Sequence, residues 1–409
     1  MQKLNNKILI IVDQISLSTG GFWTILDIAE SLRSKYDIKF CIAGINYLSS
    51  IKSFQEIVKK RFSKDLIFVY PILKKRNKKF IFNNFYLLLS SLYKLFLKIA
   101  LTNKVHDPKE IFKQTNIIFF SSFISIKDLT HINTLLNTKC IKIQNHAGSL
   151  KTLENFAENI NSSSDFKNKA YFHYLSMQDK ILFQSRSQKD HLDTTYPTLK
   201  SKSFSFLPSV NEVSLQESKK YGSPFENDKE VFNIVYVGTI QHRKRQELCI
   251  DIIQNLQHRK KNVNLYFIGD YQRDDKYYIS LKKSIEEKGL KNNIFFTGYI
   301  DSFARYMWFC DLIIHPSRAE GVPRVLREAL FMGKVIVASN LEGNIDLFKK
   351  YNSGILVESS KPESYAEEII KVIDNENLKL SYEKKARISY DKQLSFKQYK
   401  QNVISVFDN

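Results

Sequence analysis

Cysteine is scarce in this chain, since only four occur among 409 residues and they stand far apart. Each lies inside an apolar run, and no two have the spacing of metal ligands; they are Cys41, Cys140, Cys249 and Cys310. This pattern argues against a disulfide framework and predicts buried, reduced thiols in a cytosolic chain. A secretory cleavage-site pattern is missing as well, because the first segment, NKILIIVDQIS, already has the character of a strand, so we expect no signal peptide.

Long uncharged apolar runs are also missing. The most apolar segment covers residues 80–101, but Lys94 and Lys98 interrupt it, so it falls short of the roughly 20 residues that a membrane span needs. Acidic residues are few in this region: residues 52–113 hold 15 Lys and Arg against 4 Asp and Glu, which accounts for 11 of the 20 net positive charges. The basic run KKRNKK, residues 74–79, leads directly into the apolar segment.

Residues 74–101 together predict a basic, aromatic, amphipathic helix that lies on anionic lipid at the inner face of the cell membrane. A core-facing helix beside a solvated charge run fits the same residues equally well. No nucleic-acid recognition motif accompanies the charge, so we expect no nucleic-acid partner.

The GxGxxG fingerprint of nicotinamide-binding domains is absent, although the chain opens with the pattern of a β-α-β unit. Residues 7–13 predict a strand, Gly20 and Gly21 a tight turn, and residues 22–34 a helix with apolar residues at helical spacing. The next strand is predicted at residues 38–44. This is the start of a doubly wound parallel sheet.

Later strand patterns end in polar residues, which is where a parallel sheet places its ligands. A polar, turn-rich stretch at residues 204–230 predicts an interdomain linker, and a second series of strands and helices follows it. We therefore expect an α/β chain of two Rossmann-like, doubly wound domains that face each other across a cleft. Their expected bounds are 1–210 and 211–390, with a last helix at 391–409 that packs back toward the first domain.

The segment HPSRAEGVPRVLREALFMG, residues 315–333, carries most of the chemistry. It places Glu320 and Glu328 eight residues apart around the start of a short helix, for which Pro323 suits the first position and Gly333 the stop. A loop of small residues that feeds a helix exposes backbone N–H groups at the positive end of the helix dipole, which favours phosphate. The two carboxylates can then touch different parts of one extended, phosphate-bearing ligand.

This segment is the fourth of six ordered motifs that lie between residues 237 and 358. The motifs are VGTIQHRKRQEL, LYFIGD, IFFTGYI, HPSRAEGVPRVLREALFMGKVIVAS, SNLEGNIDLF and SGILVE. In this order they resemble the retaining glycosyltransferases of the GT-B fold, family 4 group, also called glycosyl transferases group 1. A lone glutamate pair is weak evidence, whereas six motifs in order are specific.

The resemblance implies a division of roles in the carboxyl-terminal half. Glu320 would contact the sugar of a nucleotide-sugar donor, and Glu328 would bind the ribose hydroxyls. Lys244 would neutralise the diphosphate, and Arg243 would add a second charge because Thr239 stands where many members have arginine. The loop backbone would hold sugar and diphosphate at Gly321, Val322, Pro323 and Val325.

In the amino-terminal half, His146 matches a histidine that some family members place beside the transferred sugar, so the resemblance implies a catalytic role for it alongside Glu320. Gly20 and Gly21 match a glycine turn that approaches the donor phosphate and the acceptor. His315 is expected to pack or hydrogen-bond near the end of its strand.

The function that the resemblance implies is a retaining, hexosyltransferase-type reaction. A sugar would move from a nucleotide-diphosphate sugar to a glycan or glycolipid, that is, a lipid-linked or polysaccharide acceptor, in cell-surface glycan synthesis such as that of lipopolysaccharide. No acidic DxD-like pair follows a strand, so we expect no metal and no cofactor besides the nucleotide-sugar as co-substrate. Two alternatives stay open: a sugar-nucleotide epimerase or phosphorylase on the same fold, and a non-catalytic protein that binds sugar-nucleotides or membranes.

Overall fold

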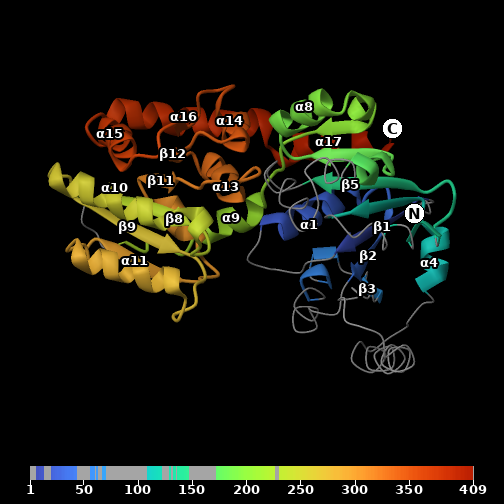
Figure 1. Cartoon of the computed structure of the whole chain (residues 1–409), viewed down its shortest axis with the longest axis horizontal. Coiled ribbons are helices and arrows are strands. Elements are labelled where there is room, and N and C mark those ends of the chain that lie inside the picture. Colours follow the sequence, from blue (N-terminus) through green and yellow to red (C-terminus); the bar gives the residue numbers. More distant parts are fainter. Residues whose placement is uncertain are drawn as a thin grey trace. The chain divides into compact units, whose positions relative to one another are not determined.

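The computed structural model describes residues 6–12, 20–43, 56–59, 61–62, 67–70, 108–121, 129, 132–134, 136–146, 172–225 and 230–408 (Figure 1). The chain divides into two compact units, and each is described by itself. The first unit falls within residues 1–17, 32–146 and 174–181, and the second within residues 18–31, 147–173 and 182–409. Residues 74–101, for which a lipid surface is predicted, lie outside the described residues.

The first sheet has the strand order β3-β2-β1-β4-β5-β6-β7. Its strands are β1 (Lys7–Val12), β2 (Asp37–Ala43), β3 (Ile67–Tyr70), β4 (Ile117–Phe120), β5 (Ile141–His146), β6 (Lys180–Phe183) and β7 (Ser203–Ser205). Strand β1 runs parallel to both β2 and β4, with Ile10 opposite Phe40 and Phe119. The apolar, β-branched run of β1 is buried on both faces, as a central parallel strand requires.

Helix α1 (Gly20–Leu32) connects β1 to β2 and confirms the β-α-β opening. It begins two residues before the predicted helix, so Gly20 and Gly21 form its first residues and not a separate turn. Glycine costs a helix most in its interior, whereas the first turn tolerates it because those residues are only partly fixed by helical hydrogen bonds. Further helices that the structure describes in this part of the chain include α4 (Pro108–Gln114), α8 (Arg186–Thr195) and the 3-10 helix η1 (Pro197–Lys202).

The predicted linker at residues 204–230 contains a helix, α9 (Glu212–Lys219), which sequence composition did not suggest. Asn211 caps it, because its side-chain oxygen accepts a hydrogen bond from the Ser214 backbone N–H at 3.1 Å. Leu215 is buried, and its carbonyl accepts a 2.7 Å hydrogen bond from the Trp308 indole. A cap and one buried apolar contact therefore order a stretch whose overall composition is polar.

The second sheet has six strands in the order β10-β9-β8-β11-β12-β13, and all neighbouring pairs are parallel. Its strands are β8 (Phe232–Val237), β9 (Val263–Ile268), β10 (Ile294–Gly298), β11 (Leu312–His315), β12 (Val335–Ser339) and β13 (Ile355–Val357). The sequence reverses direction across the sheet between β8 and β11, the two central strands. Ligands of open α/β sheets bind at this switch point, beyond the carboxyl ends of the strands.

Helices cover both faces of the second sheet. The described helices after β8 are η2 (His242–Lys244), α10 (Gln246–His258), α11 (Lys276–Glu287), α12 (Ala304–Phe309), α13 (Arg324–Met332), α14 (Glu342–Phe348), α15 (Pro362–Ile373), α16 (Glu376–Gln393) and α17 (Phe396–Asp408). One apolar cluster joins the sheet to α10, α11 and α15, and another joins it to α9, α12, α13 and α16. The α/β prediction of two doubly wound sheets is thus confirmed.

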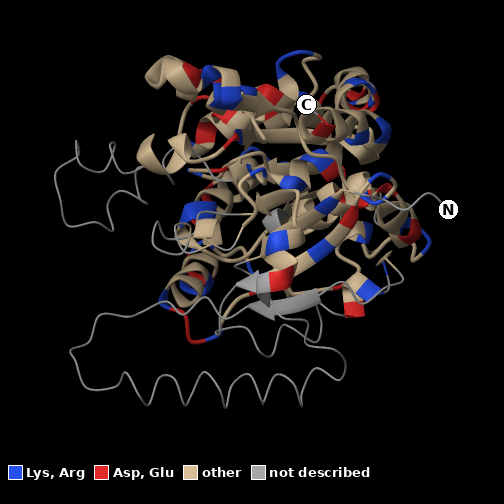
Figure 2. Cartoon of the chain, turned by 90° about the vertical axis from the view of Figure 1, so that its right-hand side faces the viewer, with Lys and Arg blue, Asp and Glu red and all other residues tan. Residues whose placement is uncertain are grey.

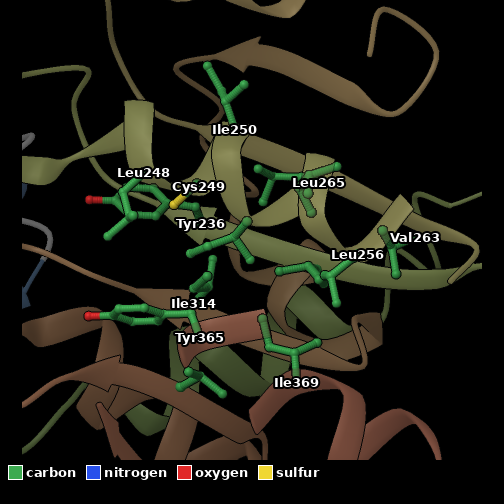
Figure 3. Close-up of a cluster of buried hydrophobic side chains, with 14 of the residues drawn as sticks. Tyr236, Leu248, Cys249, Ile250, Leu256, Val263, Leu265, Ile314, Tyr365 and Ile369 are labelled. Carbon is green, nitrogen blue, oxygen red and sulfur yellow. The ribbon is translucent and has the colours of Figure 1, made fainter. Parts of the chain in front are cut away.

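Alternation along the strands feeds these two clusters, since Ile234 and Tyr236 belong to one and Val235 to the other. Figure 3 shows the first cluster, where side chains of β8, β9, β11, α10 and α15 meet. Tyr236 and Tyr365 turn their hydroxyl groups toward the same side of it (Figure 3). Each fully buried aliphatic or aromatic side chain contributes about 1.5–3 kcal/mol, so this core fixes the strand ends on which the site depends.

All four cysteine side chains are buried, as predicted, and none forms a disulfide within the described part of the chain. Lys and Arg are interspersed with Asp and Glu over the described elements (Figure 2). None of the described helices is both long and apolar enough to cross a membrane.

Candidate active site

The glutamate segment begins where β11 ends, at His315, and continues through a loop into α13. The helix starts at Arg324, and Pro323 is its N-cap with φ −61° and ψ 129°, so the prediction that proline holds the first helical position is wrong by one residue. The ring fixes φ but leaves ψ extended, which turns the chain into the helix. Gly333 ends the helix in the left-handed region at φ 67°, as predicted.

Glu320 lies in this loop and receives two cations on one oxygen. Its Oε1 accepts hydrogen bonds from Lys244 Nζ at 2.6 Å and from an Arg243 guanidinium nitrogen at 2.7 Å. The same guanidinium nitrogen also donates to the Ala319 carbonyl at 2.7 Å. The structure therefore brings together three of the predicted site residues, from two motifs more than seventy residues apart in sequence.

Lys244 and Arg243 reach Glu320 because their segment is a 3-10 turn and not part of a helix. The sequence predicts a helix from Arg245, but Arg245 has φ 56°, in the left-handed region, and α10 begins only at Gln246. Gln246 is fully buried, and its side-chain nitrogen donates to the Thr239 carbonyl at 3.0 Å. This contact holds the loop that follows β8, so both cations of the turn face Glu320.

The electrostatics of the cluster favour the charged carboxylate. Burial raises the pKa of Glu320, but the neighbouring His315 and the charges of Lys244 and Arg243 outweigh burial and hold that pKa well below its usual range. Burial also lowers the pKa of Lys244, although the attraction of Glu320 opposes this effect. The lysine and glutamate side chains are only 13% and 12% exposed, so an anion that enters here meets partly desolvated cations.

Glu328 is the fifth residue of α13, and the side chain is buried. Its Oε1 accepts a 2.7 Å hydrogen bond from Arg324 Nε one helical turn earlier. The Arg324 guanidinium in turn lies over the Trp23 ring of α1, at 5.2 Å from the ring centre. The chain thus places the first turn of α1, with Gly20 and Gly21, in the same compact unit as α13.

Gly321 follows Glu320, and the backbone of α14 presses directly on it. A Cβ atom added at Gly343 would lie 1.6 Å from the Gly321 carbonyl oxygen, far inside any permitted contact. Asn344 supports the same helix, because its side-chain nitrogen donates to the Ser339 carbonyl at 2.8 Å. The loop that carries Glu320 therefore packs directly against Gly343 of the neighbouring helix α14.

Replacing Gly343 by alanine is expected to push the loop forward and destabilise the protein by about 1–3 kcal/mol, the usual cost of overpacking. Donor affinity should fall as well, because the loop that carries Glu320 moves. Thermal unfolding with and without a nucleotide-sugar measures both effects. Glu342→Ala, an exposed change in the same helix, is the control; equal shifts for the two variants would contradict the close contact between Gly343 and Gly321.

Sequence reasoning missed Tyr236, which lies under the turn. Its hydroxyl donates to the Lys244 carbonyl at 3.0 Å, and its ring stacks on the His315 ring with centres 5.7 Å apart. The sequence could have indicated this contact, because a tyrosine on a central strand is buried and its hydroxyl then needs a hydrogen-bond partner. The predicted contact of His315 near its strand end is confirmed, because Ser317 Oγ lies 3.3 Å from its Nε2.

His146 ends β5 in the first unit and is buried. Burial lowers the pKa of His146 to about 4, so the imidazole is neutral at neutral pH. The role inferred for it at the transferred sugar stays a prediction. Within the described residues, no three histidine, cysteine or acidic side chains gather closely enough to hold a metal ion.

Comparison with known proteins finds a family match in the carboxyl-terminal part of the chain. Residues 218–389 match the family described as Glycosyl transferases group 1. An uncharacterized glycosyltransferase of Methanocaldococcus jannaschii is 26% identical over 270 residues, which cover 62% of this chain and 67% of that protein. The capsular polysaccharide biosynthesis glycosyltransferase CapH of Staphylococcus aureus is 28% identical over 147 residues, which cover 36% of this chain and only 41% of that protein.

The fold agrees over the whole length. Anabaena HepE, whose structure is known in complex with UDP and glucose, superposes with a TM-score of 0.70 at 14% identity, covering 99% of this chain and 100% of that one. Over residues 218–389 the chain therefore matches the glycosyl transferases group 1, and its two-domain α/β fold is that of solved glycosyltransferases, as the six motifs predict.

Proposed function

We propose that this protein is a retaining glycosyltransferase that moves a sugar from a nucleotide-diphosphate sugar to a glycan or glycolipid acceptor. The observation that carries the proposal is the cluster in which Lys244 and Arg243 meet Glu320 beside the start of α13. Two cations and free helix N–H groups suit a diphosphate, and an adjacent carboxylate suits sugar hydroxyls. Glu328, farther along the helix, suits the ribose.

In the proposed reaction, the bond between the anomeric carbon and the diphosphate oxygen breaks, and its electron pair stays on the leaving oxygen. The acceptor hydroxyl oxygen bonds to the anomeric carbon on the same face, and its proton passes to the leaving diphosphate oxygen. Negative charge on the diphosphate grows as the bond breaks, so Lys244 and Arg243 bind the transition state more strongly than the ground state. We propose that these cations serve where other enzymes use a metal.

Similar proteins support the proposed classes of donor and acceptor. Anabaena HepE binds UDP and glucose, and CapH of S. aureus belongs to capsular polysaccharide biosynthesis. We infer that UDP-sugars are the first donors to test and that a cell-surface polysaccharide or its lipid-linked precursor is the acceptor.

A thermal-shift series with UDP, ADP, GDP and their glucose and N-acetylglucosamine derivatives tests the donor site. A ligand that binds the folded state at one hundred times its Kd stabilises it by about 2.7 kcal/mol, so a true donor raises the unfolding temperature clearly. We expect at least one UDP-sugar to do so, with EDTA present or absent. A flat series would contradict the donor site, and donor conversion without an acceptor would favour an epimerase.

A further inference from the structure

The burial and contacts of His315 indicate a role beyond packing at the end of its strand. The imidazole ends β11, has no exposed surface, and stacks on Tyr236 with an angle of 16° between the rings. Its Nδ1 has no hydrogen-bond partner among the described residues. A buried polar atom without a partner costs stability, and a phenyl ring would keep the stack without that cost. The other ring nitrogen is the one that faces the site.

That nitrogen, Nε2, lies between two oxygens. Ser317 Oγ is 3.3 Å away and Glu320 Oε1 is 3.6 Å away. A carboxylate requires a donor, so the proton of a neutral imidazole belongs on Nε2. Nε2 lies just beyond hydrogen-bond distance of Glu320 while Lys244 and Arg243 hold the same oxygen at 2.6 and 2.7 Å.

A bound nucleotide-sugar should affect the contacts of Glu320 with Lys244 and Arg243 differently from its contact with His315. The proposed diphosphate competes for Lys244 and Arg243, because both cations are attracted to the phosphate oxygens. The neutral imidazole carries no charge that the diphosphate attracts, so it stays with the carboxylate. Tyr236 holds both parts in place, since it stacks on His315 and donates to the Lys244 carbonyl.

We propose that His315 is a positioning residue that holds Oε1 of Glu320 when the donor diphosphate has engaged Lys244 and Arg243, and so presents Oε2 to the hydroxyls of the transferred sugar. This inference rests on the proposed function and specifies how its sugar subsite is built. No described residue hydrogen-bonds to Oε2 of Glu320, which leaves this oxygen available to a ligand.

Two substitutions separate the hydrogen-bonding role from the packing role because they remove opposite properties. His315→Phe keeps a ring against Tyr236 but has no donor, whereas His315→Gln loses the ring but keeps a side-chain N–H at a similar reach. Calorimetric titration with UDP and with a UDP-sugar gives, for each variant, the ratio of the two dissociation constants. This ratio isolates the sugar contact, because the uridine and diphosphate contacts are common to both ligands.

For His315→Phe we expect unchanged UDP affinity, an unfolding temperature at or above that of the wild type, and a UDP-sugar affinity about tenfold weaker, the value of one hydrogen bond to a charged group. His315→Gln should recover most of the sugar affinity. In a Glu320→Gln background, His315→Phe should add no further loss. His258→Gln, an exposed histidine on α10, is the control that should match the wild type throughout.

The proposal is overturned if His315→Phe keeps the wild-type ratio, if it weakens UDP and UDP-sugar equally, or if its effect persists without the Glu320 carboxylate. Failure of the proposed function looks different, because the wild-type protein itself would then bind no UDP-sugar. The two failures are therefore distinguished before any variant is compared.

Discussion

Replacing Glu320 by glutamine is expected to lower the turnover of a nucleotide-sugar donor by about 10²- to 10³-fold, the usual effect of losing one charged contact to a transition state. The carboxylate sits beside the two proposed diphosphate cations, and we propose that it contacts the next group of the donor, the sugar. Release of the nucleoside diphosphate from the donor, followed with time, measures the change. Glu320→Ala should be at least as impaired.

The loss has to be separated from unfolding. Glu320 is 12% exposed and paired with two cations, so its neutralisation should also destabilise the fold by about 1–3 kcal/mol. Turnover is therefore compared well below both unfolding temperatures. Glu368→Gln, which breaks the exposed 2.6 Å pair with Lys371, is the matched control and should leave turnover intact. Equal turnover in Glu320→Gln and wild type would end its assignment to the sugar.

Lys244→Met should have the second large effect, because methionine keeps a similar side-chain length without the charge. The Lys244 side chain is largely buried, and the Oε1 atom of Glu320 that it contacts is also contacted by Arg243. A cation in such a place stabilises the charge that develops on a departing diphosphate, so kcat should fall by about 10²- to 10³-fold. Affinity for the nucleoside diphosphate should fall with it, in contrast to Glu320→Gln.

A second lysine offers the comparison for this variant. Lys261 also forms a lysine–carboxylate pair in the second unit, at 2.5 Å from Asp374. It precedes the start of β9, whereas the glutamate segment follows the end of β11, so the two lie at opposite edges of the parallel sheet. Lys261→Met should change neither kcat nor nucleotide affinity. If Lys244→Met behaved like Lys261→Met, the lysine would be a structural partner of Glu320 and the diphosphate site would have to lie elsewhere.

Most of the fold follows from local patterns. Apolar runs such as residues 335–339 predict buried parallel strands, and β12 has the same bounds. The elements that the sequence did not predict depend on single contacts between residues far apart in the chain. Helix α14 is short and has glycine at its second position, a residue that disfavours helix formation. Glycine is required there because the backbone of Gly321 leaves no room for a side chain at position 343. Helix α9 was hidden in a polar stretch for a similar reason, since one cap and Leu215 secure it.

The candidate site was predicted as a set of residues but not as a geometry. The motifs assign Glu320, Lys244 and Arg243 to one ligand, and the structure shows them joined to one another at a single oxygen. Such an ion pair cannot be read from spacing, because it depends on the 3-10 turn that ends at Arg245 with φ 56°. Tyr236 was missed for the same reason, because its ring stacks on His315 of the neighbouring strand β11.

The contact of Glu320 with Lys244 and Arg243 should affect nucleotide affinity as well as sugar transfer. Glu320 competes with the donor diphosphate for Lys244 and Arg243, so glutamine at this position should free both cations. Calorimetric titration of wild type and Glu320→Gln with UDP therefore measures whether Lys244 and Arg243 receive the diphosphate. We expect the variant to bind UDP more tightly, by about tenfold, which is ~1.4 kcal/mol, although it transfers sugar poorly. Weaker or unchanged UDP binding in Glu320→Gln would contradict the claim that these cations receive the diphosphate.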